Sequence, residues 1–316
     1  MSGDRAVRIA RLEAWASDGG ARFDALVFPV DAAGDCTARA RRAIAADELI
    51  ASIPRRLMIV ERDARNTVAT WLVRESRRAS SRWAPFLDVW PAELPDLPIF
   101  RSDADLDALA GTAAHPLAVS FRDDVIEAQA ALPPEIRAEM PFAAFAWGRA
   151  IIESRSFRSP HASGQEITFI PILDLMNHRP GDTAWSYDGD AGAIELFALR
   201  DFAAGDEVGF TYGELGNASL LVGYGFALAH NPHDEVALSL GRGDPVLLSA
   251  RDDGRLQRAV ERAGPAKVAA AARRSLDRLG RDTATGSSSW FRACALVRQG
   301  ERAVLEQVLA NLAGAS

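Results

Sequence analysis

The amino-acid sequence predicts an α+β fold in which a helical segment interrupts a frame of short β-strands. Three observations lead to this prediction. Short apolar runs bounded by turn residues fill residues 25–54, helical periodicity replaces them from about 63 to 153, and short apolar runs return between 167 and 212. Helical patterns then close the chain, whose 316 residues suffice for one elaborated domain or two smaller ones.

The first part of the chain is predicted to be a short amphipathic helix followed by strands. Residues 6–18 are expected to be helical because Ile9, Leu12 and Trp15 recur at helical spacing. After a Gly-Gly break we expect three short strands separated by turn residues, at 25–30, 37–44 and 48–54.

The helical segment contains one particularly clear helix, PFAAFAWGRAIIESRSF at residues 141–157. Pro141 suits a first helical turn, where its missing N–H is not needed. Phe145, Ile151 and Ile152 can then face a core. We therefore expect this helix to be buried along one side.

The second β-rich part is predicted to hold four strands, at residues 167–175, 184–188, 192–199 and 207–212. A short connection containing Gly205-Asp206 joins the last two, as is typical of a β-turn. Helices are expected at 217–222 and at 265–280, where the final glycine suits a C-cap.

Composition excludes several classes of function. The formal net charge of −7 gives no reason to expect a nucleic-acid partner, because phosphate binding favours a basic surface. Cys36 and Cys294 are the only cysteines, so a disulfide framework or a four-cysteine zinc cluster cannot be built. No segment reaches the ~18 apolar residues of a membrane span, and the N-terminus lacks an apolar signal region. We expect a cytoplasmic protein with no membrane partner, and the sequence does not indicate an oligomeric state.

The stretch IPILDLMNHRPG at 170–181 places a carboxylate, an amide and an imidazole within five residues. Asp174 and His178 stand at i and i+4, a spacing that on a helix would bring both to one face and suggest a metal site. A metal site needs three or four convergent ligands, and no other histidine pairs with His178, so we predict none. The sequence also lacks a G-x-S-x-G elbow and a G-x-G-x-x-G loop.

Five segments taken together resemble the SET-domain protein methyltransferases, in particular the group of the Rubisco large-subunit lysine methyltransferase. The segments are 40–59, 80–87, 147–157, 171–178 and 205–232. Their order and spacing agree from about residue 10 to 240, and the combination of D-x-x-N-H with Y-G-x-x-x-N and Y-G-F is highly specific. We expect a divergent, prokaryotic member of this group.

The resemblance implies a SET fold of short β-sheets with a pseudoknot, in which the N-H segment and the Y-G segment lie side by side. It divides the chain into an N-terminal part of the SET domain (1–62), a helical insertion (63–145), a C-terminal part of the SET domain (146–240) and a short helical region (241–316). The implied methyl donor is S-adenosylmethionine, the commonest acceptor is a lysine of a protein or peptide, and no metal is implied.

The resemblance also assigns the residues nearest the reaction. Tyr212 matches the catalytic tyrosine, and at an unperturbed pKa of ~10 its neutral hydroxyl would orient the amine and the transferring methyl. Tyr224 and Phe226 match the aromatic lysine channel, where π faces favour a cationic stem, although simple core packing remains an alternative. Tyr212 and Phe226 are implied to contact the donor as well.

Further positions match the donor and acceptor sites. Asn177 and His178 correspond to the donor-binding pair, and Ser154 is expected at the cofactor edge. Arg155 and Asp174 match positions near the acceptor lysine. An equally weighted alternative for Arg155 is a pair with Asp174 that fixes the ends of a strand and a helix, a structural role that competes with substrate contact.

One loop departs from the family pattern. The family usually carries a glycine-rich turn where this chain has GDCTAR at 34–39, so Asp35, Cys36 and Thr37 replace the usual residues of the cofactor-binding turn. Side chains there can obstruct close backbone approach, and Cys36 is more typical of a small buried apolar residue than of a reactive thiol.

The leading hypothesis is an S-adenosylmethionine-dependent N-methyltransferase acting on a protein lysine. The short region after residue 240 leaves open an acceptor that is a small molecule, a peptide or a histidine ring. The altered loop leaves open a SET-derived binding protein without turnover.

Overall fold

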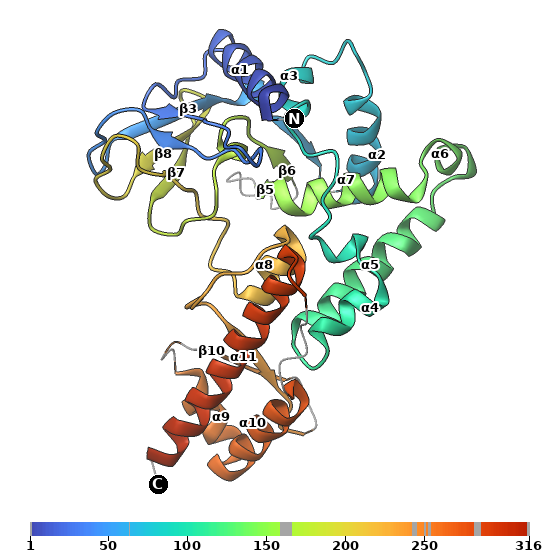
Figure 1. Cartoon of the computed structure of the whole chain (residues 1–316), viewed down its shortest axis with the longest axis vertical. Coiled ribbons are helices and arrows are strands. Elements are labelled where there is room, and N and C mark those ends of the chain that lie inside the picture. Colours follow the sequence, from blue (N-terminus) through green and yellow to red (C-terminus); the bar gives the residue numbers. More distant parts are fainter. Residues whose placement is uncertain are drawn as a thin grey trace. The chain divides into compact units, whose positions relative to one another are not determined.

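A computed structural model describes residues 2–62, 64–158, 166–241, 245–249, 251, 254–280 and 286–314. The chain forms two compact units, and each unit is assembled from two separate stretches of sequence (Figure 1). The first unit contains Met1–Ala92 and Ala143–Glu214, and the second contains Glu93–Phe142 and Leu215–Ser316. The division into SET-domain parts and an insertion that the sequence suggests stays a prediction.

The first unit is a set of small antiparallel sheets flanked by helices. Its helices are α1 (Ser2–Asp18), α2 (Arg65–Ser76), α3 (Ala84–Leu87) and α7 (Phe142–Arg155), with 3-10 turns η1 (Arg55–Leu57) and η4 (Leu173–Leu175). Its strands are β1 (Leu26–Val27), β2 (Arg39–Ala40), β3 (Leu49–Pro54), β4 (Ile59–Arg62), β5 (Phe157–Arg158), β6 (Glu166–Phe169), β7 (Thr183–Asp188) and β8 (Ala193–Ala198).

Strands from the two ends of this unit's sequence pair with each other. One sheet has the order β3-β8-β7 and another the order β4-β6-β5, so β3 and β4 each join strands that follow more than 100 residues later. In the register, Ile53 lies opposite Ile194 and Ile59 lies opposite Phe169. The prediction that a helical segment interrupts a β-rich frame is therefore confirmed.

The core of the first unit uses the apolar positions that the helical spacing indicates. Ile9 and Leu12 of α1 are buried, and Phe145, Ile151 and Ile152 of α7 are fully buried. Burying one such side chain contributes about 1.5–3 kcal/mol. Helix α7 also approaches α2 very closely, because a Cβ at Gly148 would lie 2.7 Å from a backbone oxygen of α2. A larger residue at Gly148 would force these helices apart.

The second unit is mainly helical. Its elements are η2 (Pro98–Phe100), α4 (Asp103–Leu106), η3 (Asp107–Leu109), α5 (Ala114–Ala130), α6 (Pro134–Glu139), α8 (Asn217–Tyr224), β9 (Glu235–Leu238), β10 (Val246–Ser249), α9 (Arg255–Ala263), α10 (Pro265–Leu279) and α11 (Ser289–Gly314). The fully buried Trp290 of α11 packs in a cluster with Leu109 and Leu221, which joins α11 to η3 and α8. Residues before 143 and after 214 thus share one core.

Several sequence predictions of local structure were wrong in detail. The predicted strand 167–175 ends at Phe169, and η4 replaces its second half. The predicted strand 207–212 forms only isolated bridges, because Val208 bonds to Ala38 whereas Phe210 bonds to Asn177. This change of partner prevents a continuous ladder. The strand expected at 37–44 is reduced to β2. The antiparallel pair β9–β10 was not predicted, because no element was expected at 235–238 and only helices were expected beyond residue 240.

Among the described residues, no helix combines the length and the apolar character that a membrane crossing needs.

Candidate active site

Two segments far apart in sequence form a short backbone ladder in the first unit. The N–H of Phe210 donates to the carbonyl oxygen of Asn177 at 2.8 Å, and the N–H of Arg179 donates to the carbonyl of Phe210 at 3.1 Å. His178 and Phe210 are consequently bridged in parallel. The expectation that the N-H segment and the Y-G segment lie side by side is confirmed.

Tyr212 is anchored at three points beside this ladder. Its N–H donates to Nδ1 of His178 at 3.0 Å, its hydroxyl donates to the carbonyl oxygen of Met176 at 2.8 Å, and its ring lies 5.1 Å from the imidazole, centroid to centroid. The hydroxyl proton therefore points at Met176, and the lone pairs of the phenolic oxygen point elsewhere. Tyr212 is half-buried, so its hydroxyl is held in a defined place and not fully sealed in the core.

Asn177 is exposed and is held by an acid that the sequence reasoning missed. Its Nδ2 donates to Oε1 of Glu207 at 2.9 Å, and Arg179 contacts the other oxygen of Glu207 at 3.3 Å. Only the acidic first position of the 207–212 run could have signalled this role. The Oδ1 oxygen of Asn177 lies on the side of the amide opposite the Nδ2–Glu207 bond, so the contact fixes which way the amide faces.

Asp182 was also missed, and it ties the ladder to the neighbouring sheet. Its buried carboxylate accepts from Arg179 Nε at 3.1 Å, from Arg200 Nε at 2.9 Å and from the N–H of Gly209 at 3.0 Å. The adjacent Thr183 donates from its hydroxyl to the carbonyl of Gly209 at 2.8 Å. These contacts fix the backbone just before Phe210.

Asp174 lies on η4 and is paired with Arg155 at the end of α7. Arg155 Nη1 is 3.0 Å from its carboxylate, Trp90 Nε1 donates to the same oxygen at 2.9 Å, and the Asp174 side chain is 4% exposed. Burial raises the pKa of Asp174, and the charge and hydrogen bonds of Arg155 and Trp90 oppose that rise. This pairing supports the alternative in which Arg155 has a structural role. It also brings two predicted site residues, Arg155 and Asp174, together.

The backbone just before Asp174 is strained. Ile172 has φ +72° and ψ −54° although it is β-branched and completely buried. Such a conformation is an outlier for a β-branched residue and costs of order 1–3 kcal/mol, so surrounding contacts must hold it. The strain ends β6 and turns the chain so that Asp174, Met176 and Asn177 reach the ladder.

Ser154 and the 34–37 turn complete the predicted donor side. Ser154 is half-buried and donates its hydroxyl to the carbonyl of Ala150 at 2.7 Å, one turn earlier in α7. In the turn, the N–H of Asp35 donates to the Asp31 carboxylate at 2.9 Å, and the N–H of Thr37 donates to Pro29 at 3.3 Å. These donors therefore already have hydrogen-bond partners within the protein.

Cys36 is a buried thiol, not a reactive one. Its side chain is buried, and burial raises its pKa to about 11, so the thiolate is scarce at neutral pH. The prediction that Cys36 serves as a small buried residue is supported by this geometry. The carboxylate of Asp35, by contrast, is exposed.

Tyr224 and Phe226 lie in the second unit. Tyr224 ends α8 and Phe226 follows Gly225, whose φ of +81° ends the helix in a left-handed conformation. The two rings are 6.3 Å apart at 60°, and both are half-buried. A Cβ at Gly225 would lie 3.1 Å from the backbone of Asp96, so only glycine fits this turn without a shift.

The comparison with family models decides the family. Residues 36–213, more than half of the chain, match the model described as SET domain. The chain belongs to the SET domain family. The matched range contains the ladder, Tyr212, Asp174 and Arg155, so the geometry described above lies inside the SET domain.

The known proteins similar to this SET domain protein include actin-histidine N-methyltransferases. The actin-histidine N-methyltransferases of Mus musculus and Homo sapiens are 28% and 27% identical over 262 residues, which cover 72% of this chain. That region is 43% of each relative, so the chain spans less than half of their length.

Solved structures show the same fold. The SET domain of LSMT bound to lysine and AdoHcy superposes with a TM-score of 0.75 at 18% identity, covering 98% of this chain and 91% of that one. Rubisco LSMT bound to AdoMet gives a TM-score of 0.74 at 18% identity, covering 98% and 92%. The α+β SET fold predicted from the sequence is confirmed.

The residues of this SET domain suit a nucleoside-bearing cation such as S-adenosylmethionine. Asp35 and Glu207 offer carboxylate oxygens, and Asn177 offers an amide oxygen whose orientation Glu207 fixes. Such groups can accept from hydroxyl and ammonium donors. Because the N–H groups of Gly34, Asp35 and Thr37 donate within the turn, contacts at 34–37 would use side chains and carbonyl groups.

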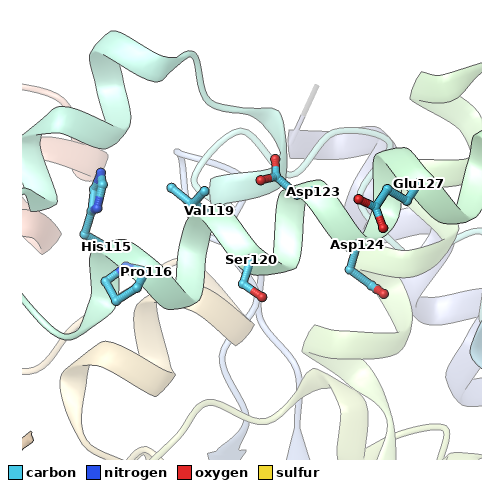
Figure 2. Close-up of a pocket in the computed structure, with 7 residues that line it drawn as sticks. All are labelled: His115, Pro116, Val119, Ser120, Asp123, Asp124 and Glu127. Carbon is cyan, nitrogen blue, oxygen red and sulfur yellow. The ribbon is translucent and has the colours of Figure 1, made fainter.

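An open groove in the second unit has a different character. It has a volume of about 590 Å³ and runs along α5, where Asp123, Asp124 and Glu127 share a face with His115 and Ser120 (Figure 2). Within the part of the chain that the structure describes, no cluster of three His, Cys, Asp or Glu side chains is arranged to hold a metal ion. None of the predicted site residues lines this groove.

Proposed function

We propose that this SET domain protein is an S-adenosylmethionine-dependent methyltransferase that modifies a side-chain nitrogen of a protein. The observation that carries the proposal is the three-point anchoring of Tyr212 beside Asn177 and His178, inside the range that matches the SET family model. When bound, S-adenosylmethionine supplies a methyl group on a cationic sulfonium.

Tyr212 is the residue to which we assign catalysis. A methyl transfer is an in-line displacement, so the chain must mainly hold the reacting groups collinear, and such positioning is worth ~7–11 kcal/mol of a barrier. Because the Tyr212 proton is directed at Met176, the phenolic oxygen is suited to accept from an amine or a polarised methyl group. We therefore assign it orientation and electrostatic stabilisation, not proton abstraction.

Donor binding is assigned to the groups around the ladder. Asn177 and His178 would hold the donor, supported by Ser154 and by the turn that contains Asp35, Cys36 and Thr37. The His178 imidazole is engaged with Tyr212, so its role toward the donor would run through its backbone. Tyr212 and Phe226 would border the donor as well.

Acceptor binding is assigned to Arg155, Asp174, Tyr224 and Phe226. Aromatic faces of Tyr224 and Phe226 favour a lysine stem and its methylated ammonium product. The carboxylate of Asp174 attracts a cation only as far as its pair with Arg155 allows, so we expect it to orient the acceptor through that pair. Tyr212 would complete the acceptor's surroundings.

Lysine is the leading acceptor and histidine the second candidate. The solved LSMT structures carry lysine or methyllysine with the spent or analogue cofactor, which supports lysine. The actin-histidine N-methyltransferases support histidine, because they match 72% of this chain. We also propose a cytoplasmic location, supported by two free, buried cysteines, which cell fractionation would test.

Donor binding and transfer test the proposal separately. Calorimetry with S-adenosylmethionine should show one site, and absence of binding at millimolar donor would favour a SET-derived protein without turnover. Transfer is then measured with methyl-labelled donor and a soluble protein extract. Labelled protein supports the proposal. If the donor binds but the label appears in the small-molecule fraction and not in protein, the acceptor is a small molecule and the proposal of a protein acceptor is wrong.

The single lysine of the chain sharpens this experiment. Lys267 is the only lysine, so Lys267→Arg gives a lysine-free enzyme. Any labelled lysine recovered with this variant must come from the acceptor. Hydrolysis of the labelled protein to amino acids then distinguishes methyllysine from methylhistidine.

A further inference from the structure

Helix α8 begins without a side-chain cap from its own sequence, and the local cap of α5 is the Thr112 hydroxyl, which accepts from the N–H of His115 at 3.3 Å. Their N-cap residues are Gly216 and Ala113, and neither provides a side-chain hydrogen bond. Distant carboxylates accept from main-chain N–H groups at both helix starts. Asp234 Oδ1 accepts from the N–H of Asn217 at 2.7 Å, and Glu301 Oε1 accepts from the N–H of Ala113 at 2.8 Å. Carboxylates are favoured at helix N-termini because unpaired N–H groups and the helix dipole meet there.

Asn217 connects the cap of α8 to the loop that follows the helix. Its Nδ2 donates to Asp234 at 3.1 Å and to the carbonyl of Leu228 at 2.9 Å, and its Oδ1 accepts from the N–H of Leu228 at 2.8 Å. Asn231 donates to the same oxygen at 3.2 Å. Both donors and both acceptor positions of the buried amide are used, so the amide ties the loop to the start of α8.

This closure fixes both ends of the segment that carries the aromatic pair. Tyr224 is the last residue of α8 and Phe226 begins the loop that returns to Asn217. A shift of the α8 N-terminus would therefore move Tyr224 along the helix axis and loosen the turn at Gly225. Leu220 and Leu221 in the middle of the segment are buried, so the hydrogen bonds at its start act together with packing in the core.

Helix α11 brings the two carboxylates together. Glu301 lies on this helix, and the preceding residue, Gly300, faces Asp234 so closely that a Cβ there would lie 1.9 Å from the carboxylate. Asp234 and Glu301 are 5% and 6% exposed. The buried Arg298 faces the same region, but its guanidinium donates to the carbonyl of Ala110 at 2.7 Å and to those of Ala108 and Leu279. Neither acid forms an ion pair with another residue that the structure describes, and the charge of Asp234 acts on Glu301.

The surroundings change the acidity of both groups. Burial raises the pKa of Asp234 to about 6, although hydrogen bonds from Asn217 oppose the rise. Burial and, to a smaller extent, the Asp234 charge raise the pKa of Glu301 to about 7, although the N–H groups of Ala113 and Ala114 and the charge of Arg298 oppose the rise. The charge of Asp234 therefore links the protonation of Glu301 to that of Asp234.

We propose that Asp234 is a positioning residue that holds the start of α8, and with it Tyr224 and Phe226, in the geometry that acceptor binding requires, while Glu301 holds the start of the adjoining α5. The inference rests on the proposed function for the role of the aromatic pair, but the holding of α8 stands on the hydrogen bonds alone. As pH rises and both acids lose their protons, repulsion between two buried charges loosens the α8 junction.

Two glycines of α11 give a matched test. Gly300→Ala places a methyl group against Asp234, whereas Gly314→Ala on the same helix meets open space. Both changes replace a helical glycine by the better helix former alanine, with the larger gain expected at the interior position 300. Hydrogen exchange, corrected for intrinsic rates, should show about a tenfold loss of protection in residues 217–224 for Gly300→Ala and none for Gly314→Ala. Asp234→Asn should keep most of the protection and lose its dependence on pH between 6 and 8.

The activity readout separates positioning from general stability. With donor binding unchanged by calorimetry, Gly300→Ala should raise the apparent KM for the labelled protein acceptor about tenfold more than it lowers kcat. Unchanged exchange in residues 217–224, or an equal loss of protection throughout the second unit, would overturn the positioning role. If the wild-type protein transfers no methyl group, the proposed function fails while the exchange result still decides whether Asp234 holds α8.

Discussion

Tyr212 and Tyr224 are held in place by different kinds of interaction. Tyr212 follows a ladder of main-chain hydrogen bonds between 177–179 and 210. Tyr224 ends a helix whose start is held by the side chain of Asp234. Main-chain groups do not titrate and, proline apart, are kept by every substitution, whereas a buried carboxylate can be changed by pH or by one mutation. The catalytic tyrosine should therefore be robust and the acceptor side adjustable.

The two buried aspartates show the same contrast. Asp174 in the first unit has a guanidinium 3.0 Å away. Among the residues that the structure describes, Asp234 in the second unit accepts from an amide and a main-chain N–H alone, and burial raises its pKa to about 6. An ionised buried acid with a cation is compensated, and one with neutral donors is not. The following substitutions and conditions test this difference.

The largest expected effect is the pH dependence of the acids in the second unit. Raised pKa values mean that the folded state keeps protons that the unfolded state has released. Asp234 and Glu301 therefore stabilise the fold fully below about pH 4, and this contribution is lost as pH rises through about 6 and 7. The loss is about 3 kcal/mol for each group.

The effect is measured as the difference in the free energy of unfolding between two proteins, by urea denaturation between pH 4.5 and 8.5. Other carboxyl groups contribute their own slopes, so the wild type is compared with Asp234→Asn/Glu301→Gln. The double variant should gain stability relative to the wild type as pH rises. Parallel curves for the two proteins would show that these acids have ordinary acidity in the folded state.

Removing the cation from Asp174 should have the next largest effect. Arg155→Ala leaves a buried carboxylate with only the Trp90 N–H as a strong donor, and such a change costs about 3–5 kcal/mol. Chemical denaturation at pH 7 measures the loss. Adding Asp174→Asn to this variant removes the uncompensated charge and should recover part of the stability. A cost below about 1 kcal/mol would mean that water compensates Asp174 and that the contrast with Asp234 is false.

Tyr212→Phe should lower turnover with little effect on donor affinity. The variant keeps the ring against His178 but loses the hydroxyl held by Met176, and we expect a fall in kcat of about 10²-fold. Calorimetry should show donor binding within about twofold of the wild type. Tyr187→Phe in β7 is the matched control, because that strand carries no assigned site residue. Equal turnover in the two variants would remove Tyr212 from the mechanism.

The sequence predicted the fold class and the adjacency of the two site segments well. It did so because the motifs around Asn177 and Tyr212 are specific, and because apolar spacing identified α1 and α7. The residues that hold the motifs were harder to find. Glu207 and Asp182 act through bonds that form only after distant segments meet, and nothing in their local sequence distinguishes them from surface acids.

The predicted strand at 207–212 failed for a similar reason. Its alternating pattern is real, but the backbone bonds first to Ala38 and then to Asn177, so tertiary partners decide its structure. The strand expected through residue 175 ends at Phe169, and Ile172 beyond it has a positive φ in a tight turn, which its propensity alone argues against. The roles of Asp234 and Glu301 could not be predicted from the sequence, because a helix cap supplied from elsewhere in the chain has no local signature.

The smallest expected effect comes from His178→Ala. This change removes the imidazole that accepts the Tyr212 N–H but leaves the main-chain bonds of Asn177, Arg179 and Phe210. One lost hydrogen bond costs about 1 kcal/mol, so exchange of the Tyr212 amide should accelerate while the Phe210 amide stays protected. Hydrogen exchange by NMR distinguishes these two amides. If protection at Phe210 is lost as well, the ladder depends on the imidazole, and Tyr212 is held by a side chain just as Tyr224 is.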